Sequence, residues 1–473
     1  MSARFKSRLL GAATALVLAT VQPLTAAAET LADTLVSAYN NSGLLAQNRA
    51  LLRAADEDVA QVVAGLRPII NWTADMSRRF GRTERRSTIP GVSTGIRTNY
   101  ATIGISLDLL LYDFGTTRLS AQAARESVPA TRESLRDIEQ QVLLRAVAAY
   151  LNVRRTAELV SVRQSNLRLL QEELRATRDR FEVGEVTRTD VALAEAQMAS
   201  ARAGLAAAQG DRRQAVEEFR NAVGRDPGAL SPPAQLPRLS GDVAAAKGLA
   251  VRKHPDILGA QHLVAATDLS VRAAEADMKP KVSFSTSLSA SEEVRGGDYE
   301  RLGSVGISVG GPIYQGGRLS SVVRKAMAQR DQQRAGLHLA RLRVEQDVGN
   351  AYADLLAAQS SREARIEEVR AARVAFEGLR EEAKLGARTT LDVLDAEQNL
   401  LDAQSGLIDA ETSLYIAAYT VLETIGELTA RDLRLDVQIY DPAAYYNLVK
   451  DAPVPISPQG QKLDRVLRAL GKQ

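Results

Sequence analysis

The sequence predicts a mostly α-helical protein in which a long helical hairpin occurs twice and each copy also carries two β-strands. Three observations predict this fold class: an internal repeat, helical runs of unusual length, and four stretches in which apolar and polar residues alternate. The repeat is clearest where residues 385–407 resemble residues 183–205. With Gly184 aligned to Gly386, nine of 22 positions are identical at a separation of 202 residues. Such similarity within one chain indicates a duplicated structural unit.

The repeated segment has the composition of a tight bend between two helices. In each copy a glycine precedes an Ala-rich run that suits a helix. The copies share an aspartate, since Asp190 aligns with Asp392, but they differ three residues later, where Leu193 is replaced by Asp395. A charge that only one copy carries is a candidate for a role beyond folding.

Residues 1–28 have the pattern of a secretory signal peptide. Their apolar run at 9–21 is followed by three alanines and then Glu29, so we expect cleavage after Ala28 and export of the protein. The cations of this segment are Arg4, Lys6 and Arg8. Without them the formal charge of +3 falls to about zero, so the charge balance gives no argument for nucleic-acid binding.

The composition also limits how the exported chain can attach to a membrane. The sequence has no cysteine, so it has neither disulfides nor the cysteine that a lipid-anchored precursor needs. After the signal peptide no apolar run approaches the roughly 18 residues of a membrane-spanning helix. We therefore expect any membrane-spanning part to consist of β-strands.

The first structural repeat is predicted at residues 29–224. A helical pattern up to residue 66 ends at Pro68, and two alternating stretches follow, separated by a polar loop at 81–98. Their apolar positions are Ile70, Trp72, Ala74 and Met76 in the first stretch and Ala101, Ile103, Ile105 and Leu107 in the second. We expect these stretches to form a hairpin of two strands, each with one apolar and one polar face.

Two long helices complete this repeat. The run at 117–183 predicts a helix about 100 Å long at 1.5 Å per residue, and the run at 187–223 predicts the helix that returns. A Pro-rich stretch at 225–242 is the expected linker between the repeats. Globular domains rarely contain such long helices, so the pattern favours an elongated molecule.

The second repeat, predicted at 243–426, has the same order. A helix at 243–278 is followed by Pro280 and by two further alternating stretches, and long helices are predicted at 319–385 and then to about residue 425. Residues 427–473 form a C-terminal segment and a tail that we expect to be flexible. Within it, the pattern at 462–470 predicts a short amphipathic helix.

The four predicted strands, about nine to eleven residues long and apolar on one face, are typical of a membrane-spanning β-barrel. Four strands cannot close a barrel, and open edges would leave unpaired backbone groups that cost several kcal/mol each in lipid. Two protomers would give eight strands around a filled interior, whereas three give twelve strands around a lumen. Small polar residues on the polar faces favour the shared twelve-stranded, trimeric barrel. The long polar helices would then form an α-barrel tunnel joined to it.

With these features the chain resembles the TolC family of outer-membrane channel-tunnel (outer membrane efflux) proteins. The resemblance rests on the signal peptide, the duplicated plan, the phrase GGPIYQGGRLS at 310–320 and the phrase GARTTLDVLDA at 386–396. It covers nearly the whole mature chain. It implies a homotrimer whose twelve-stranded barrel crosses the cell outer membrane, in contact with its lipid, and whose helical tunnel extends into the periplasm.

The resemblance also implies a function and partners. In this family the tunnel docks on a periplasmic adaptor (membrane fusion) protein and on an inner-membrane efflux pump or ABC transporter. The channel-tunnel is a passive exit duct for multidrug efflux, type I protein secretion or both, gated at its periplasmic tip. The sequence leaves the cargo open.

The resemblance places the gate and the docking of partners at the turns that contain Gly184 and Gly386. It implies that Asp392 and Asp395 form a ring of carboxylates at the pore constriction. It also implies that Arg388 binds Asp190 and so locks the closed tip.

Ordinary helix chemistry offers alternatives for two of these residues. Thr389 and Asp392 match a capping box, so Asp392 has a structural explanation. Arg388 has one as well, as a partner of Asp392 four residues later in the chain. Asp395 has no such structural explanation, because the other repeat carries Leu193 at the equivalent position. Asp395 is therefore the stronger candidate for a residue that lines the pore.

The sequence offers no catalytic or metal-binding pattern. The three histidines, His254, His262 and His338, are scattered, and the Gly-rich phrase GGPIYQGGR lacks the Lys-Ser/Thr of a phosphate-binding loop. We therefore expect no enzyme activity, no cofactor, no metal and no nucleic-acid partner. The rival hypothesis is a non-conducting periplasmic coiled-coil structural or adaptor protein, which leaves the four amphipathic strands unexplained.

Overall fold

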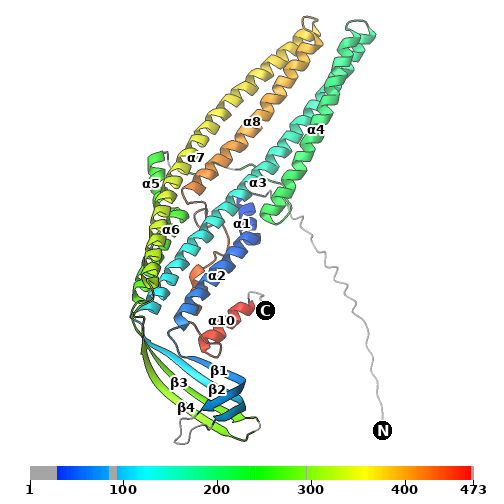
Figure 1. The fold of residues 1–473 in the computed structure, drawn as a ribbon. Helices are drawn as coiled ribbons and strands as arrows, with labels where there is room; N and C mark the ends of the chain where they lie inside the picture. Colours follow the sequence, from blue (N-terminus) through cyan, green and yellow to red (C-terminus); the bar gives the residue numbers. More distant parts are fainter. Residues whose placement is uncertain (1–28, 85–92, 234, 240, 295, 470–473) are drawn as a thin grey trace, which may run out of the picture.

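The computed structural model describes residues 29–84, 93–233, 235–239, 241–294 and 296–469, so the predicted signal peptide lies outside the described residues. The molecule is elongated, with two hairpins of long helices at one end and a curved sheet at the other (Figure 1). The helices are α1 (Leu31–Asn41), α2 (Gly43–Ala64), α3 (Thr116–Glu182), α4 (Arg188–Val223), α5 (Val243–Lys253), α6 (Pro255–Ala276), α7 (Arg318–Lys384), α8 (Thr390–Thr424), α9 (Pro442–Val449) and α10 (Pro458–Ala469).

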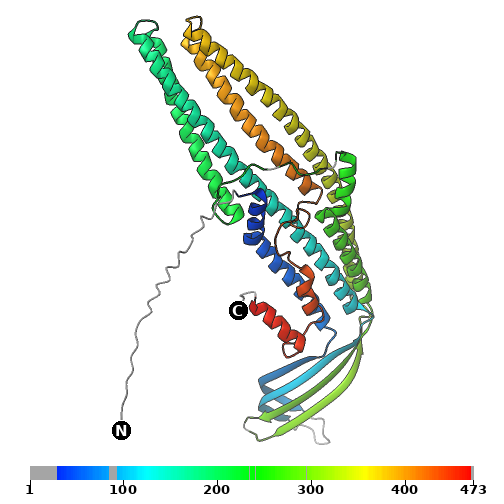
Figure 2. The same ribbon diagram turned by 180° about the vertical axis from the view of Figure 1, so that it is seen from behind.

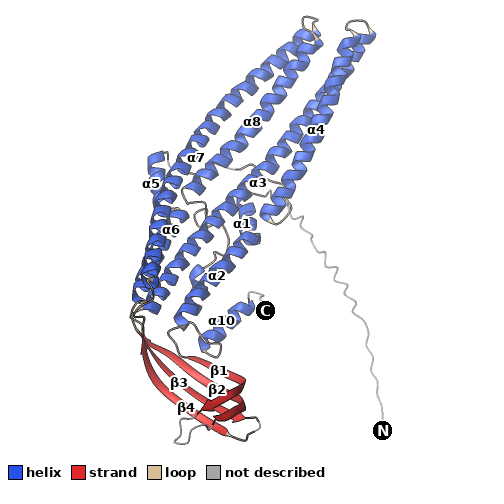
Figure 3. Cartoon of the chain, in the orientation of Figure 1, coloured by secondary structure: helices blue, strands red, loops and turns tan. Residues whose placement is uncertain are grey.

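The long helices match the predicted ranges to within a few residues. The helices α3 and α7 each contain 67 residues, and α4 and α8 return alongside them. Helices and strands are segregated along the length of the molecule (Figure 3). This arrangement confirms the predicted fold class of a mostly helical chain with a small four-stranded sheet.

Two helices that the sequence predicted as continuous are broken. The first is interrupted at Ser42, whose Oγ accepts a hydrogen bond from the Leu45 amide at 3.2 Å and caps α2. The second is interrupted at His254, because Pro255 has no amide hydrogen and begins a new helix, α6. Ser42 and His254 are separated by 212 residues, the separation of Pro68 and Pro280, so both repeats bend at the same place.

The four strands form one antiparallel sheet in the order β1-β2-β3-β4. They are β1 (Ile69–Glu84), β2 (Ser93–Tyr112), β3 (Lys281–Glu293) and β4 (Tyr299–Gly310). At 16, 20, 13 and 12 residues they are longer than predicted. The β1–β2 ladder continues to the pair Glu84↔Ser93, into the predicted polar loop, because backbone pairing does not require the apolar alternation that marks a strand in the sequence.

The strand register places apolar side chains on one face of the sheet and polar side chains on the other. Trp72 pairs with Ile105, which pairs with Leu288, so these apolar side chains share one face. The side chains of Trp72 and Leu288 are 75% and 68% exposed. On the other face Ser287 and Ser304 lie opposite each other, with their hydroxyl oxygens 2.8 Å apart. The predicted apolar and polar faces are both present.

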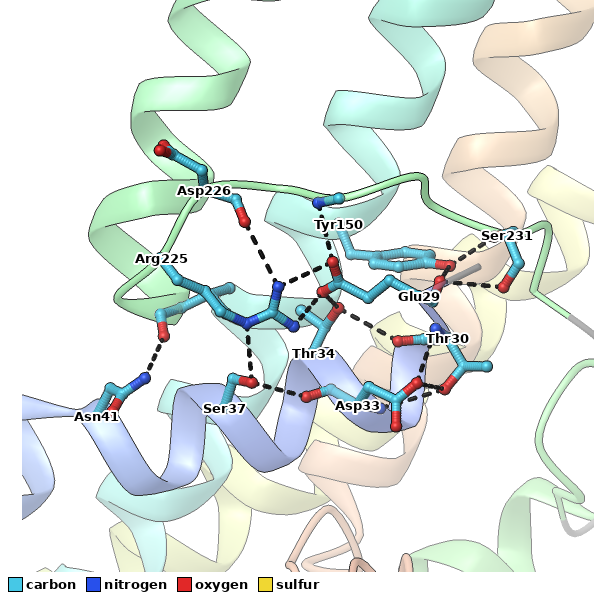
Figure 4. A network of polar contacts seen from close by, with 12 residues as sticks. Glu29, Thr30, Asp33, Thr34, Ser37, Asn41, Tyr150, Arg225, Asp226 and Ser231 are labelled. Carbon is cyan, nitrogen blue, oxygen red and sulfur yellow. Dashed lines mark hydrogen bonds and ion pairs between the residues drawn. The ribbon is translucent and has the colours of Figure 1, made fainter. Parts of the chain in front are cut away.

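A polar network fixes the first described residue, Glu29, to the inter-repeat linker (Figure 4). The Arg225 guanidinium donates to both carboxylate oxygens of Glu29, at 2.5 and 2.9 Å, and the Thr34 hydroxyl donates to one of them at 2.7 Å. The Glu29 carbonyl accepts bonds from the Ser231 amide at 2.9 Å and from the buried Tyr150 hydroxyl at 3.2 Å. This network holds α1, α3 and the linker together near the middle of the molecule (Figure 2).

Candidate functional site

The candidate site is the helical tip, where each hairpin turns at the end farthest from the sheet (Figure 1). Gly184 and Gly386 have φ values of 83° and 76°, in the left-handed region that glycine adopts without strain. The Glu185 amide donates to the Arg180 carbonyl at 2.9 Å, and the Ala387 amide donates to that of Glu382 at 2.9 Å. Both long helices therefore end in the same C-terminal capping motif.

A capping box begins the returning helix after each turn. The Asp190 Oδ2 accepts from the Thr187 amide at 2.8 Å, and the Asp392 Oδ2 accepts from the Thr389 amide at 3.0 Å. In return, the threonine hydroxyls accept from the aspartate amides at 3.3 and 3.2 Å. The alternative explanation of Asp392 as a capping residue is thus confirmed.

These bonds hold both capping aspartates in their ionised form. Hydrogen bonds from the Thr187 side chain and backbone lower the pKa of Asp190 below its ordinary value. Hydrogen bonds from the Thr389 backbone and side chain do the same for the pKa of Asp392. Each carboxylate also lies at the positive end of a helix, which favours its negative charge.

Asp395 lies one turn further along α8 and is exposed, whereas its neighbours Leu394 and Ala396 are buried. Its repeat counterpart, Leu193, is 37% exposed. The two repeats therefore place a carboxylate and a leucine at the same accessible position of the tip. The predicted constriction ring of Asp392 and Asp395 stays a prediction, since a ring requires neighbouring protomers.

Arg388 is paired within its own turn. Its Nε donates to the Glu382 Oε2 at 2.8 Å, which replaces the pairing with Asp392 that the spacing suggested. The cause is the capping motif, because the Ala387–Glu382 backbone bond returns the chain to the last turn of α7.

Arg388 and Asp190 nevertheless line one pocket, of about 510 Å³, together with residues of both turns. Its other cations are Arg180 and Lys384. Within the protomer the structure pairs Arg388 with Glu382 and Asp190 with Thr187, so the predicted Arg388–Asp190 lock requires a rearrangement across this pocket. The lock stays a prediction.

The structure adds a residue that sequence reasoning missed, Glu397. This carboxylate is 4% exposed and accepts a hydrogen bond from the Asn166 Nδ2 at 2.7 Å, which joins α8 to α3. Burial raises its pKa to about 7, and the negative charge of Glu173 adds to this shift. The repeat counterpart Glu195 is exposed and paired with Arg178 at 2.5 Å. Because both repeats carry glutamate here, no sequence signal distinguished the buried one.

Glu397 lies where the two hairpins pack against each other near the tip. Leu170 of α3, Ala201 of α4 and Leu394 of α8 form a small buried apolar cluster. Further along α8, the Arg155 Nη1 donates to the Asp409 Oδ1 at 2.9 Å. The second hairpin thus rests on the first through α8, which begins at Thr390, directly after the turn that contains Gly386 and Arg388.

Among the described residues, no group of three or more His, Asp or Glu side chains is arranged to hold a metal ion. Within the same part of the chain, no helix has the length and apolar character needed to cross a membrane.

Comparisons with known proteins agree with the duplicated fold. The family model described as outer membrane efflux protein matches residues 34–225 and again residues 248–427, which together make up more than half of the chain. Each matched segment contains two of the strands and one pair of long helices.

Individual relatives extend this similarity to most of the chain. The outer membrane efflux protein BepC of Brucella suis is 37% identical over 428 residues, which cover 90% of this chain and 91% of the relative. The outer membrane protein TolC of Escherichia coli is 26% identical over 85% of this chain and 84% of its own length. The crystal structure of the CmeC outer membrane channel of Campylobacter jejuni, at 16% identity, superimposes with a TM-score of 0.72 over 90% of each chain, so it shares the fold.

Proposed function

The chain belongs to the outer membrane efflux protein family, and on this premise we propose that it is the outer-membrane channel-tunnel of an export system. In this proposal three copies form a passive exit duct across the periplasm and the outer membrane. A partner in the inner membrane supplies the energy.

The observation that carries the proposal is the open four-stranded sheet with one exposed apolar face. The strands β1 and β4 are its two edges, and every residue of β4 is exposed. Val305, Ile307 and Val309 of β4 are 68–76% exposed. An apolar face of this kind suits lipid, and unpaired edges in lipid must pair with neighbouring copies. Pairing β4 of one protomer with β1 of the next would close twelve strands around the serine-rich face.

The long helices suit the periplasmic part of such a duct. At about 1.5 Å per residue, α3 and α7 are each about 100 Å long. Their turns at Gly184 and Gly386 are then the docking sites for an adaptor and an inner-membrane efflux pump or ABC transporter. Asp392 and Asp395 form the constriction, and the Arg388–Asp190 lock holds the resting tip closed. The cargo is drugs, secreted protein or both.

Conductance of the purified protein in planar lipid bilayers tests the proposal. A duct gives discrete, reproducible single-channel currents because each inserted trimer contains one pore. A non-conducting coiled-coil structural or adaptor protein leaves the bilayer at its baseline conductance, and that result would reject the proposal. Heat-unfolded protein at the same concentration is the control for detergent artefacts.

A further inference from the structure

The C-terminal helix α10 starts at the level where the sheet begins. The preceding helix α9 is fixed to α2, since the Tyr445 hydroxyl donates to the Glu57 Oε1 at 2.6 Å. Arg67, two residues before β1, then donates to the backbone carbonyls of Asp451 and Ala452. Two opposite views both show α10 beside the helix-side end of the strands (Figures 1 and 2).

The start of α10 is held in place by contacts with the segment before it. The Gln459 Nε2 donates to the Leu448 carbonyl at 2.7 Å, and the Gly460 amide donates to the Ser457 Oγ at 3.0 Å. Gly460 is buried, and a Cβ there would come within 2.2 Å of the Val454 carbonyl oxygen. These contacts fix the direction in which α10 leaves α9, while most of its side chains from residue 461 onward stay exposed.

Basic and apolar residues occupy different sides of α10. Lys462, Arg465 and Arg468 follow one another at intervals of three residues and are exposed. Leu463 and Val466, also three apart, lie on the side that adjoins this basic row, with Val466 one turn after Lys462. With one acidic residue, Asp464, the described helix has a formal charge of +2. The turn before it adds Val454 and Ile456, which are 50% and 86% exposed.

We propose that α10 lies on the periplasmic leaflet of the outer membrane and binds anionic phospholipid through Lys462, Arg465 and Arg468. This inference rests on the proposed function, because a membrane-spanning sheet puts the membrane surface near Ile69 and therefore beside α10. A basic amphipathic helix in this position inserts its apolar side between the lipids and places its cations at their phosphates. Charge complementarity identifies the occupant as anionic lipid.

Covalent attachment to the rest of the chain compensates for the low membrane affinity of so short a helix. A free peptide of 12 residues would bind a membrane poorly, but α10 is held beside the bilayer by the sheet and α9, so its binding is intramolecular. In a trimer, three copies would form a collar around the base of the barrel. The collar would fix how deep the barrel lies in the bilayer.

The absence of cysteine allows a direct test with the full-length chain. A single cysteine is introduced as Val466→Cys on the apolar side, or as Gln461→Cys on the polar side as a control, and carries an environment-sensitive fluorophore. The protein is reconstituted into phosphatidylcholine vesicles with or without phosphatidylglycerol, together with a lipid that carries a nitroxide near its headgroup. Nitroxide quenching then reports whether the label lies in the bilayer.

We expect the label at position 466 to be quenched in vesicles with phosphatidylglycerol, and the label at 461 much less. Replacing Lys462, Arg465 and Arg468 with Gln should shift the equilibrium towards the unbound helix by about fivefold per cation. The matched control replaces three exposed arginines of α4 with Gln and should leave quenching unchanged. These arginines are Arg202, Arg212 and Arg213.

The outcomes separate the two proposals. Vesicles that conduct ions while the label at 466 stays unquenched overturn the lipid role of α10 and leave the duct intact. The same holds if the label is equally shielded in detergent and in both kinds of vesicle, since α10 then packs on protein. Vesicles that do not conduct overturn the duct, and the lipid role falls with it.

Discussion

The buried carboxylate Glu397 should make the helical tip less stable as the pH rises. Its side chain is 4% exposed and its neighbour Glu173 is also acidic. In the wild type, Glu397 accepts a hydrogen bond of 2.7 Å from Asn166. Glu397→Gln removes the ionisable group and keeps an oxygen that can accept this bond. We therefore expect this substitution to stabilise the protein at alkaline pH.

The direction of this pH dependence of stability follows from the direction of the pKa shift. The pKa of Glu397 rises from 4.5 in the unfolded chain to about 7 in the folded protein. The folded state therefore binds the proton more tightly, and its stability decreases as the pH rises from about 4.5 to about 7. At 1.36 kcal/mol per pKa unit, the upper limit of the loss is roughly 3 kcal/mol. Glu397→Gln should therefore recover up to this amount of stability at about pH 8 and change the stability little at about pH 4.

The assay is urea unfolding followed by far-UV circular dichroism across this pH range, for the wild type and for two variants. The matched control is Glu195→Gln, because Glu195 occupies the equivalent position, is exposed and pairs with Arg178. Since that pair is exposed, the control should change stability by less than about 1 kcal/mol at any pH. If the stability difference between Glu397→Gln and the wild type varies with pH as little as the difference between the control and the wild type, ionisation of Glu397 carries no cost in stability. That result would contradict the prediction.

Three further predictions concern the tip and the assembly. Thr389→Ala removes a helix cap, so it should lower the free energy of unfolding by about 0.5–2 kcal/mol and speed amide hydrogen exchange at the start of α8. Thr187→Ala should have the same effect at the start of α4, and unchanged exchange would argue against a capping role. If Arg388 locks the tip to Asp190, Arg388→Ser should raise the open-channel conductance, whereas an unchanged value would leave Arg388 with only its bond to Glu382. Native mass spectrometry in mild detergent should show a trimer, and a stable monomer would contradict the closure of a shared barrel.

Much of the fold could be predicted because it follows from repetition and periodicity. The 202-residue offset located both turns. In each turn the glycine specifies the helix end, and the threonine and aspartate that follow it specify the capping box. The break at Ser42 was missed because serine is compatible with a helix interior and its capping role depends on the local backbone. Pro255 was a visible signal for the second break, since proline often begins a helix.

The partners of side chains at the site were harder to predict. Arg388 binds Glu382 because the capping motif brings residues six apart in the sequence into contact. The helix rule used in the sequence analysis considers only side-chain pairs three or four residues apart. Glu397 and Glu195 are identical in the sequence and differ only in what packs on them. Tertiary packing between the hairpins decides which glutamate is buried, and the repeat pattern carries no information about it.

The measurement that tests the central claim most directly is the reversal potential of single channels in a salt gradient. If the tip is the narrowest part of a passive duct, the carboxylate of Asp395 attracts cations there, and salt screens this attraction. Asp395→Ala should therefore move the reversal potential towards zero, while Asp211→Ala on the exposed surface of α4 should leave it unchanged. A channel whose cation selectivity is the same with and without Asp395 would contradict a constriction at this tip.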